Sequence, residues 1–558
     1  MKQKVFNCLL LLLFICVSQL NVAQSVFHEQ LYAQTDRQLY LPGETIWFSA
    51  FHSDQSNHSP IPFQTLGYVE LIKGNQAYVQ KKILLSAGKG AGYIQLPLTL
   101  ASGNYQLKIY TNWMKNFGPE SFFTKNIAIV QPSEKKLPEL KVSMDKTIPA
   151  KDSFSIQLDP LPTKLKSRSK VTVKGHIPSA NKGTVLLARV YLDNEEQRNP
   201  DVHLNDAANT IKEENFQPRF LPEIGLQFIE ARIKDRSSGI APGDTAYLSI
   251  PGETPLMFTS VINPDGKAVF RLNKMVYGKT SMVVQVIKAG KHFGNMEIMS
   301  PFFEEYSSTP LSTSGVQQFD DLQKRMIAQQ LLFRDDVSDT LSKAFLLPFD
   351  SLMFYGHPDF VYRLDDFTRF PTMEEVLREY VIEVIVQKRS KGYYFESITR
   401  NRLGVPTVHR PVTLLDGVPI SADAAIKVNP LKIERIDIIP KRYFMGTAFF
   451  DGIISIKTYS GSLGELELDA GVLPVDYEAL LPPKDFPQVT YEQLNQLESR
   501  KPDFRTTLYW IPFLEPNADG SFEFNFYTSD LKGNYRVEVE GFDEKGRWGS
   551  GVLKLEVE

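Results

Sequence analysis

Residues 411–461 read PVTLLDGVPISADAAIKVNPLKIERIDIIPKRYFMGTAFFDGIISIKTYSG. Short apolar runs in this stretch end or begin at Asp-Gly pairs, which occupy residues 416–417 and 451–452. An Asp-Gly pair between apolar runs favours a tight turn, because glycine adopts a positive φ without steric cost. In the run at residues 433–439, charged side chains lie between the isoleucines, as in a strand with one wet face and one buried face. The stretch therefore predicts a small sheet of three strands.

A helix is expected just before this sheet. T-M-E-E at residues 372–375 has the form of a capping box, in which the first and fourth side chains bond each other's backbone amides. Val376, Leu377 and Tyr380 supply the apolar face that such a helix needs. The helix and the three strands together predict a small α+β module.

The order of these elements resembles the plug domain of TonB-dependent outer-membrane receptors. The resemblance rests on L-L-D-G-V-P-I at 414–420, I-E-R-I-D-I at 433–438 and D-G-I-I-S-I at 451–456. In that family the plug fills a large barrel whose strands each need ~9–11 residues to cross the membrane. Residues 462–558 are too few for such a barrel, so we expect no transporter from this chain. An unrelated small α+β domain stays open as the alternative.

The first residues have the layout of a secretory signal. Lys2 and Lys4 precede an apolar run at residues 8–17, which is too short to span a bilayer. We expect cleavage after Ser25, with cleavage after Ala23 as the competing choice. Both cysteines, Cys8 and Cys16, would be removed with it. The exported chain is then expected to have no disulfide, no thiolate metal site and no transmembrane segment.

Composition describes an ordinary globular protein. The 558 residues are 42% hydrophobic and 23% charged, and 62 Lys plus Arg against 65 Asp plus Glu give a net charge of −3. A clustered basic face, which nucleic-acid binding calls for, is not seen. The length suggests about four domains.

Internal repeats indicate several similar β domains. P-G-E-T-I-W-F at residues 42–48 recurs as P-G-D-T-A-Y-L at 242–248, and more loosely at 149–156. N-P-D-G at 263–266 and N-A-D-G at 517–520 are tight turns that lead into alternating strands. Short strands with regularly spaced turn signals predict antiparallel sandwiches.

Two segments resemble macroglobulin-type β-sandwiches, the domains of the alpha-2-macroglobulin family. They are residues 35–48, TDRQLYLPGETIWF, and residues 506–541, TTLYWIPFLEPNADGSFEFNFYTSDLKGNYRVEVEG. The combination is similar to bacterial extracytoplasmic proteins that string such sandwiches around a plug-like module. Protease-trapping macroglobulins use a thioester built on Cys-Gly-Glu-Gln. Since no cysteine is expected in the exported chain, we exclude covalent trapping.

The fold class expected is mainly β, with tandem macroglobulin or immunoglobulin-like sandwiches, a small plug-like α+β domain and a helical connector. An amphipathic helix is predicted over residues 316–333, and a long exposed loop over 194–217. The expected boundaries are 1–25 signal peptide, 26–135 first sandwich, 136–217 second sandwich with the exposed loop, 218–305 third sandwich, 306–370 helical connector, 371–461 plug-like domain and 462–558 C-terminal sandwich.

No catalytic residue, cofactor site or metal site is predicted. The eight histidines are scattered, and neither G-x-S-x-G nor a phosphate-binding or dinucleotide fingerprint occurs. His52 and His58 share a polar loop but match no established metal site. Residues 515–520 imitate the start of a calcium loop, yet Phe526 stands where its glutamate ligand is required, so a hairpin turn is predicted there.

The function expected is binding, as a subunit or partner of an outer-membrane assembly in the periplasm or at the cell surface. The predicted partner surface is the turn formed by Asp416, Gly417, Val418 and Pro419, because loops on a rigid sheet often carry contacts. Two alternatives stay open. Glycan binding would use the aromatic side chains crowded at residues 110–123. Noncovalent protease inhibition would use residues 194–217 as a cleavable loop.

Overall fold

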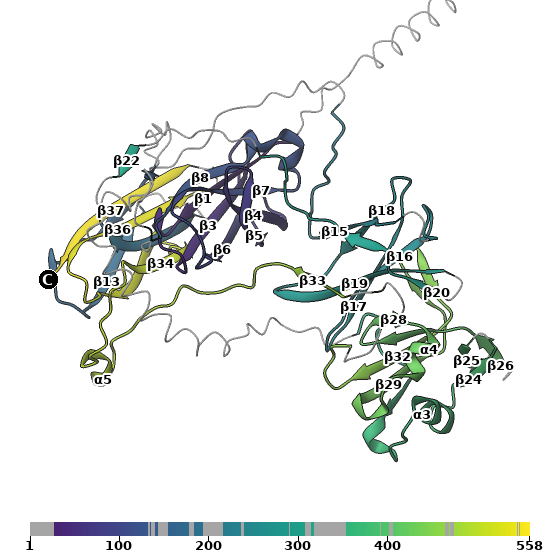
Figure 1. Ribbon diagram of the computed structural model, residues 1–558. Helices are drawn as coiled ribbons and strands as arrows, with labels where there is room; N and C mark the ends of the chain where they lie inside the picture. The colour runs from purple at the N-terminus through teal and green to yellow at the C-terminus, as the bar shows by residue number, and fades with distance from the viewer. Residues whose placement is uncertain are drawn as a thin grey trace, which may run out of the picture. The chain divides into compact units, whose positions relative to one another are not determined.

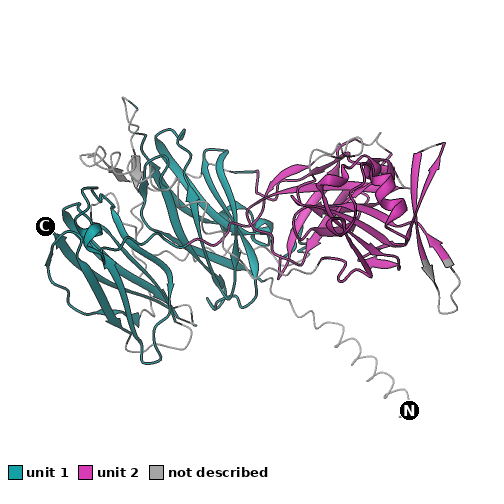
Figure 2. Cartoon of the chain, turned by 90° about the horizontal axis from the view of Figure 1, so that it is seen from below, with its two compact units in different colours: residues 1–222, 305–335, 485–558 teal, residues 223–304, 336–484 magenta. Residues whose placement is uncertain are grey.

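The chain folds into two compact units built mostly of β-strands (Figures 1 and 2). The computed structural model describes residues 27–131, 134, 140–142, 154–177, 184–193, 216–235, 239–288, 291–306, 314–316, 353–390, 392–400, 406–463, 468, 472, 474–543, 545 and 547–558. Unit 1 comprises residues 1–222, 305–335 and 485–558, and unit 2 comprises residues 223–304 and 336–484. Within the described ranges, no helix is long and apolar enough to cross a bilayer. The predicted fold class, mainly β with tandem sandwiches, is confirmed.

The first sandwich of unit 1 is formed by one continuous segment. Its sheets have the orders β1-β3-β6 and β2-β8-β7-β4-β5. Phe48, Leu66 and Ile109 are fully buried in it. The strands are β1 (Glu29–Thr35), β2 (Leu39–Tyr40), β3 (Thr45–Asp54), β4 (Thr65–Lys73), β5 (Gln76–Leu85), β6 (Lys89–Gln95), β7 (Gly103–Thr111) and β8 (Phe123–Ile129), with 3₁₀ helices η1 (Met114–Phe117) and η2 (Pro119–Ser121) before β8.

The second sandwich of unit 1 is formed by two segments far apart in the sequence. Its sheets have the orders β10-β37-β36-β14-β34 and β11-β13-β35, and β12 also pairs with β37. The early segment supplies β10 (Phe154–Ser155), β11 (Gln157–Leu158), β12 (Lys164–Leu165), β13 (Lys170–His176) and β14 (Val185–Leu192). The late segment supplies β34 (Thr507–Leu514), β35 (Ser521–Tyr527), β36 (Gly533–Phe542) and β37 (Trp548–Val557).

This arrangement corrects the prediction of separate sandwiches over residues 136–217 and 462–558. β14 lies between β34 and β36, with Tyr191 opposite Thr507 on one side and Val190 opposite Val537 on the other. Val173, Val190 and Val537 share one core. The strands of either segment would leave this core open, so the two segments complete one another. We call the result the composite sandwich.

Three further elements of unit 1 lie outside both sandwiches. β9 (Leu140–Val142) pairs with β22 (Ser314–Val316), and α5 (Leu494–Leu497) precedes β34. Val316, where an amphipathic helix was predicted to begin, is therefore in a strand. The remainder of that prediction, residues 317–333, lies outside the described residues.

Unit 2 contains the third sandwich. Its sheets have the orders β18-β15-β21 and β17-β16-β19-β20, and β33 also pairs with β19. Ala231, Leu248 and Phe270 are fully buried in its core. The strands are β15 (Gln227–Ile233), β16 (Thr245–Ile250), β17 (Leu256–Val261), β18 (Lys267–Leu272), β19 (Lys279–Lys288), β20 (Lys291–Phe293), β21 (Met296–Ile298) and β33 (Val475–Glu478).

Unit 2 also contains the α+β module predicted around residues 411–461. Its five-stranded sheet has the order β23-β29-β32-β27-β28, and a second sheet has the order β24-β25-β26. The elements are β23 (Phe360–Arg363), η5 (Leu364–Asp366), α3 (Met373–Glu379), β24 (Val384–Arg389), β25 (Gly392–Arg400), β26 (Pro406–His409), β27 (Val412–Leu415), β28 (Val418–Ile420), α4 (Ala422–Ile426), η6 (Pro430–Lys432), β29 (Ile433–Ile439), β30 (Tyr443–Met445), β31 (Ala448–Phe450) and β32 (Ile453–Thr458).

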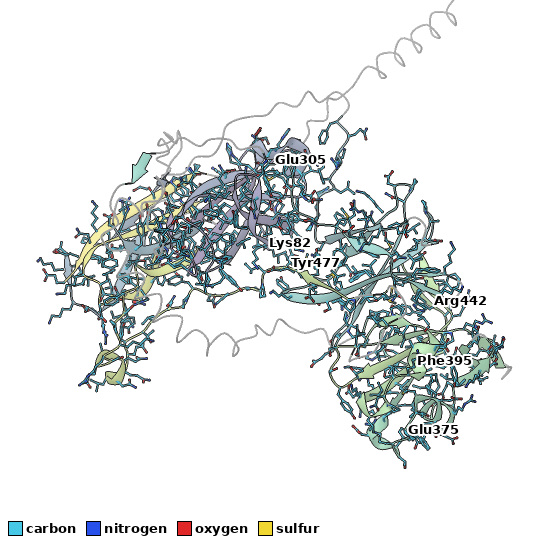
Figure 3. The ribbon with its side chains drawn as sticks, viewed as in Figure 1. Lys82, Glu305, Glu375, Phe395, Arg442 and Tyr477 are labelled. Atoms are coloured by element: carbon cyan, nitrogen blue, oxygen red, sulfur yellow. The ribbon has the colours of Figure 1, made fainter. Side chains whose placement is uncertain are left out.

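The sequence correctly predicted the first helix and three strands of this module, but not its first strand. The capping box forms as predicted, since the Thr372 side chain accepts a hydrogen bond from the Glu375 amide and Glu375, labelled in Figure 3, reaches back to the Thr372 amide. The three predicted strands are β27, β29 and β32. The sheet, however, also includes β23, inside the 306–370 segment predicted as a helical connector. β23 joins the sheet because it pairs antiparallel with β29, from Phe360 opposite Ile438 to Arg363 opposite Arg435. This pairing links segments about 75 residues apart, which local sequence patterns do not predict.

Candidate interaction surface

The turn singled out in the sequence forms as a two-residue hairpin between β27 and β28. Asp416 and Gly417 have φ values of 46° and 85°, which suits a turn that needs positive φ at both central positions. The Asp416 carboxylate accepts hydrogen bonds from the Thr458 amide at 2.8 Å, the Thr458 hydroxyl at 2.7 Å and the Leu463 amide at 2.9 Å. The aspartate thus ties the turn to the end of β32.

This turn is covered by the third sandwich, which corrects the prediction of a partner surface. A Cβ added at Gly417 would lie 2.2 Å from Cβ of Pro255, and the Gln285 side-chain amide donates to the Pro419 carbonyl at 2.9 Å. Asp416 is 1% exposed and Val418 is fully buried. Asp416, Gly417, Val418 and Pro419 therefore serve a contact inside unit 2. The apolar residues that follow Gly417 were the sequence signal for this burial.

An apolar cluster extends this contact between the α+β module and the third sandwich. Tyr247 and Met257 of the sandwich share one buried cluster with Leu414, Ile439 and Ile453 of the module. Buried area of this kind stabilises by about 25 cal/mol per Å². The two parts of unit 2 are consequently held by apolar packing as well as by the Gln285 hydrogen bond.

Unlike the buried turn between β27 and β28, the hairpin of β30 and β31 has one exposed face. Phe444 and Phe449 are directly opposite one another, with ring centroids 6.3 Å apart, and are 71% and 53% exposed. The inner face carries Ala448 and Phe450, which are buried in the cluster described above. The Thr259 hydroxyl also donates to the Met445 carbonyl at 3.0 Å. We call Phe444 and Phe449 the aromatic pair.

A cation borders the aromatic pair. The guanidinium carbon of Arg442, labelled in Figure 3, lies 4.8 Å from the centroid of the Phe449 ring, and its Nε is 2.7 Å from Asp451. The sequence did carry a signal for this site. In a hairpin that turns at Gly446, alternate residues share a face, so Phe444 and Phe449 point away from the side that holds Phe450.

The residues considered for metal binding do not come together. His52 Nε2 lies 3.1 Å from the Glu29 carboxylate, both nearly inaccessible, whereas His58 Nδ1 lies 3.3 Å from the Gln30 side chain. Asp519 accepts from the Ser521 amide and hydroxyl, which lowers the pKa of Asp519 and forms the predicted hairpin turn. No cluster of three or more His, Cys, Asp or Glu side chains suited to a metal ion occurs in the part of the chain that the structure describes.

Of the aromatic residues considered for glycan binding, Tyr110, Phe117 and Phe122 are buried, whereas Trp113 and Phe123 are partly buried. Tyr110 is fully buried and stacks on Phe122 with centroids 4.2 Å apart. Trp113 donates its indole N–H to the Phe27 carbonyl, and Phe117 stacks on Phe216 at 5.5 Å. These contacts support the first sandwich. The predicted loop at 194–217 lies outside the described residues except for its last two.

A polar cluster lies buried between the two sandwiches of unit 1. The Arg189 guanidinium donates to Glu538 from Nε at 2.9 Å and from Nη2 at 2.7 Å, and it reaches Glu540 at 3.2 Å. Burial alone would raise the pKa of Glu538, but the guanidinium groups of Arg189 and Arg536 bring it below its ordinary value. Burial raises the pKa of Glu540 to about 7. The pKa values of these two carboxyl groups therefore differ, because Glu538 accepts two hydrogen bonds from Arg189 and Glu540 accepts one.

Comparison with known proteins yields likeness at the level of structure alone. No family model matches the chain, and no curated protein matches it. An alpha-2-macroglobulin of Salmonella reacted with methylamine is 10% identical with a TM-score of 0.24, covering 95% of this chain and 39% of that one. An Escherichia coli alpha-2-macroglobulin activated by porcine elastase is 10% identical with a TM-score of 0.24, covering 95% and 44%. The chain thus spans about two fifths of these macroglobulins, and at such scores the likeness assigns neither a family nor an activity.

Proposed function

We propose that this chain is an exported, non-enzymatic binding protein of the cell envelope, and that it contacts an outer-membrane or surface protein through the aromatic pair, Phe444 and Phe449. The observation that carries the proposal is the exposure of two opposed phenylalanines on a hairpin whose other face is buried. Exposed apolar side chains that cluster on a well-supported element mark interaction sites.

The energetics of such a contact are favourable. Full burial of a phenylalanine side chain stabilises by about 1.5–3 kcal/mol, and aromatic and arginine side chains dominate the binding energy of interfaces. Because Thr259 and the buried cluster already fix the hairpin, little conformational entropy would be lost on binding. Arg442 adds a charged group at the rim of the aromatic pair.

The remaining parts of the proposal rest on the sequence. Export rests on the secretory layout of the first 25 residues, and an envelope partner rests on the resemblance of the α+β module to receptor plugs. The non-enzymatic part rests on the lack of nucleophile, phosphate-binding and dinucleotide motifs in the sequence. Fold resemblance does not carry function with it, so each part needs its own test.

Site-specific photocrosslinking in intact cells tests the contact. A photoreactive phenylalanine analogue is placed at Phe444, at Phe449, and at Tyr78, which is 38% exposed on the first sandwich and serves as the matched control. We expect both hairpin positions to yield the same crosslinked envelope protein, and Tyr78 to yield none of it. The double variant Phe444→Ser/Phe449→Ser should lose co-purification with that protein while keeping the wild-type thermal transition. Equal crosslinking from all three positions would contradict the proposal. Co-purification of a polysaccharide and no envelope protein with the wild-type chain would also contradict it.

A further inference from the structure

Three side chains of different strands meet within the buried polar cluster of unit 1. Gln34 is on β1 and Lys125 on β8, both in the first sandwich, and Glu540 is on β36 of the composite sandwich. They are 1%, 8% and 3% exposed. Lys125 Nζ lies 3.0 Å from Gln34 Oε1, and Gln34 Nε2 donates to Glu540 Oε2 at 2.9 Å.

These contacts place an amine at the oxygen of the Gln34 amide and a carboxyl group at its nitrogen. The amide carbon of Gln34 is bonded to the oxygen that Lys125 already contacts, so Nζ lies close to the carbon that it would attack. Reacting atoms held about 3–3.5 Å apart in a fixed geometry react as if at very high concentration. The Glu540 carboxyl group contacts the nitrogen that would have to leave, and it also interacts electrostatically with Lys125.

We propose that Lys125 and Gln34 join in an intramolecular isopeptide bond, with Glu540 as the proton relay. The Lys125 ammonium gives one proton to the Glu540 carboxylate, and the resulting amine attacks the Gln34 amide carbon to form a new C–N bond. Glu540 then donates that proton to the Gln34 nitrogen and accepts the surplus proton of the attacking nitrogen. The old C–N bond breaks, ammonia leaves, and the carbonyl re-forms. No oxidant or second reactant is required.

The environment of Glu540 suits the relay. A group that both accepts and donates a proton works best when its pKa is near the ambient pH, and burial raises the pKa of Glu540 to about 7. Arg189 holds the other oxygen of Glu540 at 3.2 Å, so the oxygen facing Gln34 is fixed in place. Exclusion of water by the surrounding sandwiches favours amine attack over hydrolysis.

The position of Glu540 in the composite sandwich determines when during folding the reaction can occur. β1 and β8 belong to different sheets of the first sandwich, so the bond would join those two sheets covalently. The relay comes from the composite sandwich, whose β36 is synthesised near the end of the chain. The crosslink would therefore form only after the two sandwiches of unit 1 have docked.

Mass spectrometry of the full-length wild-type protein, expressed with its leader, tests the proposal. We expect the intact mass to be lower, by the mass of one ammonia, than the mass calculated for the chain after removal of the leader. Trypsin should leave Lys125 uncleaved and yield one crosslinked species, made of the N-terminal peptide that ends at Arg37 and residues 116–135. A folded wild-type protein whose Gln34 and Lys125 peptides are recovered separately and unmodified would overturn the proposal.

Variants separate this loss of ammonia from other sources. An N-terminal Gln24, exposed by cleavage after Ala23, could also lose ammonia by cyclisation, but Lys125→Arg would not prevent that. We expect Lys125→Arg, Gln34→Leu and Glu540→Gln each to abolish the crosslinked peptide. Lys73→Arg is the matched control, because Lys73 donates to the Ser102 backbone carbonyl, which belongs to a peptide bond and not to a side-chain amide that could release ammonia. A crosslink that persists at full yield in Glu540→Gln would overturn the assigned relay.

Discussion

Arg189 and Glu538 lie directly opposite one another on the neighbouring strands β14 and β36, joined by two hydrogen bonds of 2.9 and 2.7 Å. The guanidinium is completely inaccessible and also donates to the Thr35 carbonyl of the first sandwich at 3.0 Å. The Arg189 side chain thus bonds a carboxylate of the composite sandwich and a backbone carbonyl of the first sandwich. A buried pair of this kind is costly to break, because the surviving charge stays out of water.

Replacement of Arg189 by methionine should destabilise unit 1 by about 3–5 kcal/mol, since Glu538 and Glu540 would stay buried without the cation that they share. All four tryptophans of the chain lie in unit 1, so urea unfolding followed by tryptophan fluorescence reports on this unit. Lys174→Met is the control: Lys174 pairs with Glu523 at 3.5 Å with both side chains more than half exposed, and its loss should cost less than ~1 kcal/mol. Equal losses would argue against a structural role for the buried pair.

Unit 1 should fold without unit 2. The strands β14 and β34, which flank the long intervening segment, pair antiparallel, with Tyr191 opposite Thr507. Replacing residues 223–484, which comprise unit 2 and the 305–335 segment of unit 1, by a short Gly-Ser linker should therefore preserve the composite sandwich. We expect the same tryptophan emission maximum and a single cooperative unfolding transition. An emission maximum shifted to that of the urea-unfolded chain would show that unit 1 depends on the removed residues.

Substitution of Gly417 by alanine should disturb unit 2 severely. Its φ of 85° costs an alanine about 1 kcal/mol, and the new Cβ would also overlap Pro255. Gly356→Ala is the matched control, because its φ is 75° and a Cβ there meets nothing within 4 Å. Hydrogen exchange of the β27 and β28 amides should accelerate at least tenfold more in Gly417→Ala than in Gly356→Ala. Indistinguishable exchange in the two variants would contradict the buried position of the turn.

The stability of unit 1 should depend on pH through Glu70. Burial raises the pKa of Glu70 above its ordinary value of 4.5, although Tyr306, Gln80 and Tyr110 donate to its carboxylate. Between pH 4.5 and the raised pKa the folded state binds more protons than the unfolded state, so the unfolding free energy falls as pH rises through this window and is constant above it.

Glu70→Gln should remove the pH dependence of the unfolding free energy that Glu70 causes. The difference in unfolding free energy between the wild type and the variant should therefore change from pH 4 to pH 7 and then level off. Tryptophan fluorescence at a series of pH values measures it. Glu523→Gln, at a carboxylate that is about half exposed, serves as the control. A difference that stays constant across the window would show that Glu70 has the same pKa in both states.

The sequence alone determined the local features of this protein. The capping box at Thr372, the Asp416-Gly417 turn and the alternating strands each depend on a few neighbouring residues, whose backbone preferences act over one turn of chain. The mainly β class followed from the same short-range patterns. The aromatic pair was also within reach of the sequence, since the alternation around Gly446 places Phe444 and Phe449 on one face.

Tertiary structure alone decided which strands share a sheet and which turns are covered. The strands of residues 154–193 and 507–557 have similar alternating patterns, and nothing local distinguishes one sandwich made of both from two separate ones. Their pairing is selected by the burial of Val173, Val190 and Val537 in one core, a gain that exists only once distant segments meet. The same holds for the turn at Asp416 to Pro419 and for the meeting of Gln34, Lys125 and Glu540, because both depend on contacts between domains that no local propensity encodes.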